Sequence, residues 1–190
     1  MRVLIIRCSL NPDSRSARLA THAAELLTAE HGADVETVNL REYELPLCDG
    51  GEAYMHPNVA KMKSHIDAAD AVLLAVPVYN YYANAAAKNL IELTGRVWTD
   101  KVVGFLAAAG GHGSYMSLMS LANSLMLDFH CLIVPRFVYT TDQGFHEAGH
   151  PQPNVELRIR ELCHDLAHLG RTWQENNRPD RPENSSSSLS

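Results

Sequence analysis

The 190-residue chain has few cysteines, and their spacing excludes several kinds of site. Cys8, Cys48, Cys131 and Cys163 lie far apart and form no C-x-x-C pair. This spacing argues against a disulfide framework, an iron–sulfur cluster and a zinc ribbon. We therefore expect four buried or inert thiols.

Long hydrophobic runs are also missing. A membrane-spanning helix needs about 20 consecutive apolar residues, and no stretch of the chain approaches that length. The apolar start, Val3 to Ile6, is followed by Cys8-Ser9 and Asn11-Pro12-Asp13, and it is too short for a signal peptide. We expect a cytoplasmic protein with no membrane partner.

Positive charge is in deficit, because 16 lysines and arginines face 22 aspartates and glutamates, for a net charge of −6. A broad basic face for nucleic acid is therefore not expected. Any bound anion must be held locally, by backbone N–H groups and a few chosen side chains. The length and the 46% hydrophobic content are typical of one soluble globular domain.

Several catalytic motifs are absent as well. The chain has no G-x-x-x-x-G-K-[ST], no G-x-G-x-x-G after its first apolar run and no G-x-S-x-G. These absences argue against a P-loop NTPase, a dinucleotide-binding fingerprint and an α/β-hydrolase. His164 and His168 are four residues apart but have no third ligand at a suitable spacing, so we predict no metal site.

The chain does contain a regular alternation of apolar runs and amphipathic segments. The runs predict five strands, at residues 3–6, 35–40, 71–76, 102–107 and 131–134. The segments predict helices at about 14–31, 58–68, 84–94, 114–129 and 154–174. Strands separated by helices form a parallel sheet covered on both faces. We therefore predict an α/β, flavodoxin-like three-layer sandwich over residues 1–174, with strand order 2-1-3-4-5, and a disordered tail over 175–190.

In that strand order the ligand site lies where the order reverses, beyond the carboxyl ends of the strands. The loop over residues 9–16 meets this point. It carries Ser9, Ser14, Arg15 and Ser16 at a predicted helix start. Helix N-terminal N–H groups, hydroxyls and a guanidinium suit a monophosphate. Helix capping by exposed polar residues is the alternative interpretation.

Two further loops meet the same point. Residues 77–84 hold three tyrosines and two asparagines, which offer a flat cofactor a surface and hydrogen bonds. The alternative is an oligomer interface, which also favours tyrosine. Residues 110–114, Gly-Gly-His-Gly-Ser, allow backbone to approach a ligand closely.

Together these residues resemble the NAD(P)H-dependent FMN reductase family, which includes quinone and chromate reductases and azoreductases. The resemblance covers about residues 1–174, and its most specific part is Pro77-Val78-Tyr79-Asn80 followed by Lys88-Asn89. It implies FMN and NAD(P)H as cofactors. It implies that the FMN phosphate is bound by Ser9, Ser14, Arg15 and Ser16, and that the ring and ribityl chain are bordered by Pro77, Val78, Tyr79, Asn80, Gly110, Gly111 and His112.

The function that follows is hydride transfer from NAD(P)H to flavin and then to free flavin, a quinone or a similar small acceptor. Since the cofactor carries this chemistry, we predict no catalytic side chain. Tyr81 and His112 are candidates for shaping the acceptor pocket. Arg96 is a candidate for meeting a 2′-phosphate, but an exposed, salt-bridging arginine is the favoured interpretation of this residue. The family implies a homodimer or homotetramer. An FMN electron carrier and a non-catalytic flavin-binding module are the alternatives.

The chain also departs from the family pattern in two places. Cys8-Ser9 stands where many members have Gly-Ser, and Tyr81-Tyr82-Ala83-Asn84 stands where many have Ser-x-Pro.

Overall fold

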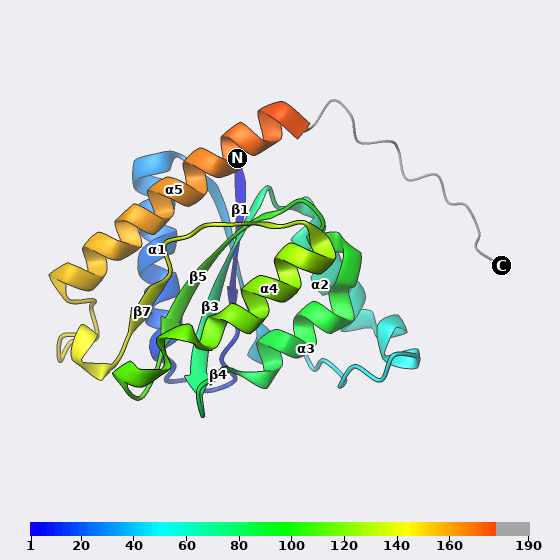
Figure 1. Ribbon diagram of the computed structural model, residues 1–190, viewed down its shortest axis with the longest axis horizontal. Coiled ribbons are helices and arrows are strands. Elements are labelled where there is room, and N and C mark those ends of the chain that lie inside the picture. Colours follow the sequence, from blue (N-terminus) through cyan, green and yellow to red (C-terminus); the bar gives the residue numbers. More distant parts are fainter. Residues whose placement is uncertain (178–190) are drawn as a thin grey trace.

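The computed structural model describes residues 1–177 (Figure 1). Its strands are β1 (Arg2–Arg7), β2 (Asp34–Asn39), β3 (Ala71–Tyr79), β4 (Tyr82–Ala83), β5 (Val102–Ala108), β6 (Leu132–Ile133) and β7 (Val138–Thr140). Its α-helices are α1 (Arg15–His31), α2 (Pro57–Ala68), α3 (Ala85–Thr94), α4 (Met119–Phe129) and α5 (Pro153–Asn177). Short 3₁₀ turns are η1 (Leu40–Glu42), η2 (Glu52–Met55), η3 (Gly95–Trp98), η4 (His112–Leu118) and η5 (Asp142–Gly144).

The sheet has the predicted topology. Its main path runs β2-β1-β3-β5-β6 with every pair parallel, which confirms the order 2-1-3-4-5. The described sheet has seven strands rather than the predicted five. One addition is β4, which forms an antiparallel hairpin with β3. The other is β7, which pairs with β5 further along than β6 does. Between β6 and β7 stands Pro135, which has no N–H to continue the ladder.

Helices cover both faces of the sheet, as Figure 1 shows. Alternate residues of the buried strands feed two apolar clusters. Leu4, Ile6, Leu74 and Phe105 pack with buried residues of α2, α3 and α4. On the other face, β-strand residues such as Ile5 pack with buried residues of α1 and α5. This arrangement is the three-layer sandwich expected from the sequence.

Two helix boundaries differ from the prediction. The helix expected from residue 114 begins only at Met119, because residues 112–118 form the 3₁₀ turn η4. Gly111 and Gly113 disfavour an α-helix there, and the Ser114 hydroxyl bonds the Tyr139 hydroxyl (2.8 Å) rather than capping a helix. At the other end, α5 runs to Asn177, so the first three residues of the expected tail are helical. The rest of that predicted tail, 178–190, lies outside the described residues.

The four cysteines are unpaired, and three of them are buried. Burial raises the pKa of Cys131 and of Cys163 to about 12, and it raises the pKa of Cys8 still further. Cys48 is half-buried, with its Sγ 3.5 Å from the Tyr54 hydroxyl oxygen. The prediction of buried thiols is confirmed for the other three. Across residues 1–177, no helix is both long enough and apolar enough to span a membrane.

Candidate functional site

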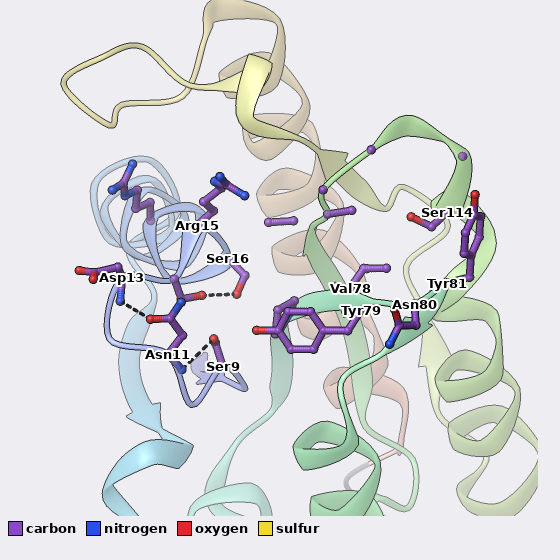
Figure 2. Close-up of a pocket in the computed structure, with 18 residues that line it drawn as sticks. Ser9, Asn11, Asp13, Arg15, Ser16, Val78, Tyr79, Asn80, Tyr81 and Ser114 are labelled. Carbon is purple, nitrogen blue, oxygen red and sulfur yellow. Dashed lines mark hydrogen bonds between the residues drawn. The ribbon is translucent and has the colours of Figure 1, made fainter.

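A cleft of about 920 Å³ lies beyond the carboxyl ends of β1, β3 and β5, where the strand order reverses (Figure 2). The three predicted loops form its walls. Every predicted cofactor residue except His112 lines it. The lining residues are Ser9, Asn11, Asp13, Ser14, Arg15, Ser16, Arg18, Pro77, Val78, Tyr79, Asn80, Tyr81, Ala108, Ala109, Gly110, Gly111, Gly113 and Ser114.

One end of the cleft is built from buried serines at the start of α1. Ser9, Ser14 and Ser16 are 4%, 7% and 1% exposed. The Ser14 and Ser16 hydroxyl oxygens are 2.8 Å apart, and Ser9 accepts a hydrogen bond from the Asn11 N–H (3.2 Å). Ser14 is also the N-cap of α1 and accepts from the Ala17 N–H, so the capping interpretation holds as well. The hydroxyls and the free N–H groups of the first helical turn meet at one place.

Two arginines accompany this helix start. The Arg15 guanidinium donates to the Asp142 carboxylate at 2.5 Å, so its charge is already compensated. Arg18, one turn further along α1, lines the same cleft and has no ion pair or hydrogen bond with any residue in 1–177. The first turn of α1 contains no acidic residue. Since a helix N-terminus is itself positive, this end of the cleft favours an anion.

The opposite wall is the β3–β4 hairpin. Pro77 and Val78 are buried, and Tyr79 is 54% exposed. Figure 2 shows the Tyr79 ring extending into the cleft toward the serine loop. The two turn residues, Asn80 and Tyr81, have φ of 49° and 65°. Two consecutive positive φ values are typical of a type I′ hairpin turn. The hairpin presents aromatic surface and backbone groups to the cleft.

The third wall of the cleft is the loop with Gly110 and Gly111, which carries no side chains at these two positions. A Cβ placed on Gly110 or on Gly111 would have no protein atom within 4 Å. Gly111 has an extended backbone, with φ of −160°, which any residue adopts. Neither packing nor Gly111's own conformation therefore requires glycine, and a side chain here would project into open space.

One predicted residue, His112, and one candidate, Arg96, lie elsewhere. His112 is absent from the cleft wall, and its Nε2 is 3.4 Å from the Gln143 Oε1 instead. Arg96 lies in η3, directly after α3. α3 starts beside the cleft, where the Asn84 amide donates to the Cys8 carbonyl oxygen, and η3 leads into the amino end of β5, which is the end of the strand opposite the cleft. Arg96 is therefore badly placed to meet a nucleotide bound in the cleft.

The sequence interpretation missed some cleft residues. Arg18 is the most important of them, and its signal was the three-residue spacing from Arg15, which places both on one side of a helix. Asn11 and Asp13 lay inside the predicted loop but were given no role. Among residues 1–177, no group of three or more histidines, cysteines or acidic residues is placed to hold a metal ion.

The fold and the cleft define a class of protein. A parallel sheet of this order, with an anion-favouring helix start facing an aromatic hairpin at the switch point, is a flavodoxin-like α/β protein with a cofactor-sized cleft.

The chain belongs to the NADPH-dependent FMN reductase family, whose family model matches residues 1–146. This confirms the resemblance seen in the motifs. The protein is therefore an oxidoreductase that depends on flavin and a nicotinamide nucleotide.

Relatives and solved structures agree with the assignment. The chain is 24% identical over 139 residues to an NAD(P)H-dependent FAD/FMN reductase of Geobacillus thermodenitrificans (strain NG80-2), covering 72% of this chain and 75% of that protein. It is 27% identical over 177 residues to a probable NADPH:quinone oxidoreductase 2 of Oryza sativa subsp. japonica, covering 87% and 85%. The flavoenzyme NAD(P)H:(acceptor) oxidoreductase FerB from Paracoccus denitrificans shares the fold, with a TM-score of 0.73 at 20% identity, covering 90% and 97%.

Proposed function

We propose that the cleft holds FMN with its phosphate at the start of α1 and its ring along the β3–β4 hairpin. The observation that carries this placement is the anion-favouring end of the cleft, where Ser9, Ser14 and Ser16 surround the N-terminus of α1. The cleft volume also lies within the range of small-molecule and cofactor sites.

The residues present fit this cofactor. A monophosphate needs several donors and some positive charge but no metal ion. The serine hydroxyls and the first-turn N–H groups supply the donors. Because Asp142 compensates Arg15, the uncompensated charge comes from Arg18. Gly110 and Gly111 leave room for a flat ring against their backbone.

The reaction we propose moves a hydride from NAD(P)H, through flavin, to a small acceptor. Bound FMN supplies the ring that takes up the hydride and returns two electrons. The protein's own part is to hold the reactants stacked and to exclude water, which requires no acid–base side chain. Tyr79, Pro77 and Val78 are the residues we expect to position the ring.

The test uses purified protein. We would record its visible absorbance as isolated and then follow oxidation of NADH and of NADPH with and without added FMN. A flavin spectrum or FMN-dependent oxidation supports the proposal. Riboflavin, which lacks the phosphate, is the matched control and should bind more weakly. A protein that binds no flavin, even at high added FMN, would contradict the proposal.

Family membership favours a reductase over the electron carrier and the non-catalytic module. The named relatives suggest a flavin or a quinone as acceptor. The cytoplasmic location stays a prediction, and so does the homodimer or homotetramer. We expect Met126 and Leu127, exposed on α4, at a subunit contact, and light scattering would measure the assembly.

A further inference from the structure

A second pocket, of about 280 Å³, opens on the far side of Tyr81 from the serine loop. It shares Tyr81, Gly113 and Ser114 with the main cleft, and Figure 2 shows Tyr81 and Ser114 together at this boundary. Tyr82 and Met116 add to its wall. We call it the side pocket.

Three serines contribute to one wall of the side pocket. Ser114, Ser117 and Ser120 are spaced by three residues, and all three line it. Ser114 and Ser117 belong to the turn η4, with Ser114 at a kink where the backbone is not helical, and Ser120 lies in the first turn of α4. The junction of η4 with α4 therefore supplies the hydroxyls of this wall.

The middle hydroxyl has no partner in the described chain. Ser117 is 8% exposed, and its Oγ is buried without a hydrogen bond to any residue in 1–177. Ser114, by contrast, bonds Tyr139. A buried polar atom without a partner is rare and costly. A ligand oxygen in the side pocket would accept the hydrogen bond that the Ser117 hydroxyl can donate.

The boundary with the main cleft is held by an unusual contact. A Cβ placed on Gly113 would lie 3.2 Å from the Tyr81 hydroxyl oxygen, so glycine lets the ring lie against the loop. Tyr81 itself has φ of 65°, a left-handed conformation that is costly for an aromatic residue. The fold keeps this ring between the two pockets despite that cost.

The side pocket is neutral. Its walls are two tyrosine rings, Met116, a glycine and hydroxyls, and within the described chain no charged side chain lines it. Aromatic rings and hydroxyls suit a planar ligand with carbonyl oxygens. An anionic ligand such as a sulfonate would lose hydration here without gaining a partner.

We propose that the side pocket is the acceptor subsite, that its ligand is a neutral quinone, and that the Ser117 hydroxyl donates to a quinone carbonyl oxygen. This inference rests on the proposed function. In the net reaction, NAD(P)H is oxidised to NAD(P)⁺ and delivers a hydride's two electrons and proton. With one further proton from solvent, the two quinone carbonyls become the two hydroxyls of the hydroquinone.

The first test removes the hydroxyl. We would measure Ser117→Ala in the FMN-loaded protein with 2-methyl-1,4-naphthoquinone and with ferricyanide, an anion that accepts electrons without needing a hydrogen-bonding pocket. Loss of one neutral hydrogen bond should raise the KM for the naphthoquinone about three- to tenfold. The ratio of naphthoquinone to ferricyanide turnover should fall accordingly. Ser124→Ala, on α4 outside the side pocket, is the matched control and should behave as wild type.

The second test fills the side pocket without touching the core. Ser120 is exposed, so Ser120→Phe should fold and should occupy the space. Calorimetry on the oxidised, FMN-loaded protein should then show weaker naphthoquinone binding, by tenfold or more. Asn123→Phe, exposed on α4 beyond the side pocket, is its control.

Two results would overturn the subsite. One is an unchanged naphthoquinone KM and affinity in both variants. The other is an equal loss with naphthoquinone and ferricyanide, which would place the effect at the flavin. Failure of the proposed function is distinguishable, because wild-type protein would then bind no FMN at all.

Discussion

Two arginines near the start of α1 differ in how much positive charge they offer a ligand, because one of them is already paired with a carboxylate. Arg15 and Arg18 line the same cleft, but Asp142 lies 2.5 Å from the Arg15 guanidinium. An arginine already paired with a carboxylate adds little net charge for a ligand phosphate. The motif pointed to Arg15, and the geometry points to Arg18.

We therefore expect Arg18→Ala to weaken FMN binding about 10- to 100-fold, as loss of a charge-assisted hydrogen bond of about 1.5–3 kcal/mol implies. Riboflavin affinity should stay close to wild type, because riboflavin has no phosphate. Quenching of flavin fluorescence measures both constants. Arg41→Ala, on the turn η1 and outside the cleft lining, serves as control. An equal loss for the two flavins would show that Arg18 supports the cleft rather than the phosphate.

Gly111 provides a second prediction for a single residue. Since a Cβ there meets no protein atom within 4 Å, Gly111→Ala should leave the thermal midpoint within about 1 °C of wild type. It should weaken FMN binding roughly tenfold or more, because the methyl group enters the space proposed for the ring. Thermal unfolding without flavin and a flavin titration separate the two effects.

Gly144→Ala is the contrasting control. A Cβ on Gly144 would clash with the Thr140 Oγ1 and would crowd the Val155 side chain at 3.0 Å, so the surrounding structure must shift. We expect a loss of about 1–3 kcal/mol of stability. If Gly111→Ala were the more destabilising of the two, the open space beside Gly111 would not exist in solution.

Among the elements, the β3–β4 hairpin has a strained backbone at Tyr81, and the same residue lines both pockets. Its turn places Tyr81 in the left-handed region, where glycine is favoured, and Asn-Gly is the preferred type I′ pair. Tyr81→Gly should therefore stabilise the fold by about 1 kcal/mol, or roughly 2–4 °C in the thermal midpoint. Turnover with quinones should fall as the wall of the side pocket is lost. A lower midpoint would mean that the contact with Gly113 outweighs the backbone strain.

The same hairpin shows where sequence patterns stop being informative. Residues 71–76 formed an unbroken apolar run and were predicted as a strand, but β3 continues through Pro77 to Tyr79. Within a sheet, proline is usually confined to edge strands, strand starts and bulges. Here Pro77 pairs in register with Ala108 of β5, and it lies beyond Ala75, the last residue of β3 that pairs with β1. The two-residue turn lacked the glycine that normally reveals a hairpin, so β4 went unpredicted.

For the whole molecule, the topology was predictable because few arrangements satisfy five buried strands with right-handed crossovers. The strand order then fixed where the three loops meet, and most of the cleft followed. Side-chain partners that are far apart in the sequence could not be predicted in this way. The Asp142 carboxylate on Arg15 and the Gln143 amide near His112 come from η5, more than a hundred residues from the first loop, and no local pattern shows them.

The packing of α1 against α5 should make the stability of the whole fold depend on pH. At the end of α1, the His31 ring lies 5.8 Å from the ring of His164 on α5, which in turn stacks on His168 at 6.4 Å. The His31 Nε2 is buried and has no hydrogen-bond partner among residues 1–177. Burial, reinforced by the nearby His164 and Arg171, lowers the pKa of His31 from its ordinary value of 6.5.

A lowered pKa in the folded state means that the unfolded chain binds more protons near pH 6. Stability must then rise with pH through that window and fall as the pH drops below about 6.5. We expect the wild-type thermal midpoint to be lower at pH 5 than at pH 8. His31→Asn, which keeps a polar side chain but cannot be protonated, should lose less between the two values. Midpoints measured at both pH values, on protein without flavin, give the comparison. If the difference between the midpoints at pH 5 and pH 8 were the same in His31→Asn as in wild type, the acid sensitivity would come from groups other than His31.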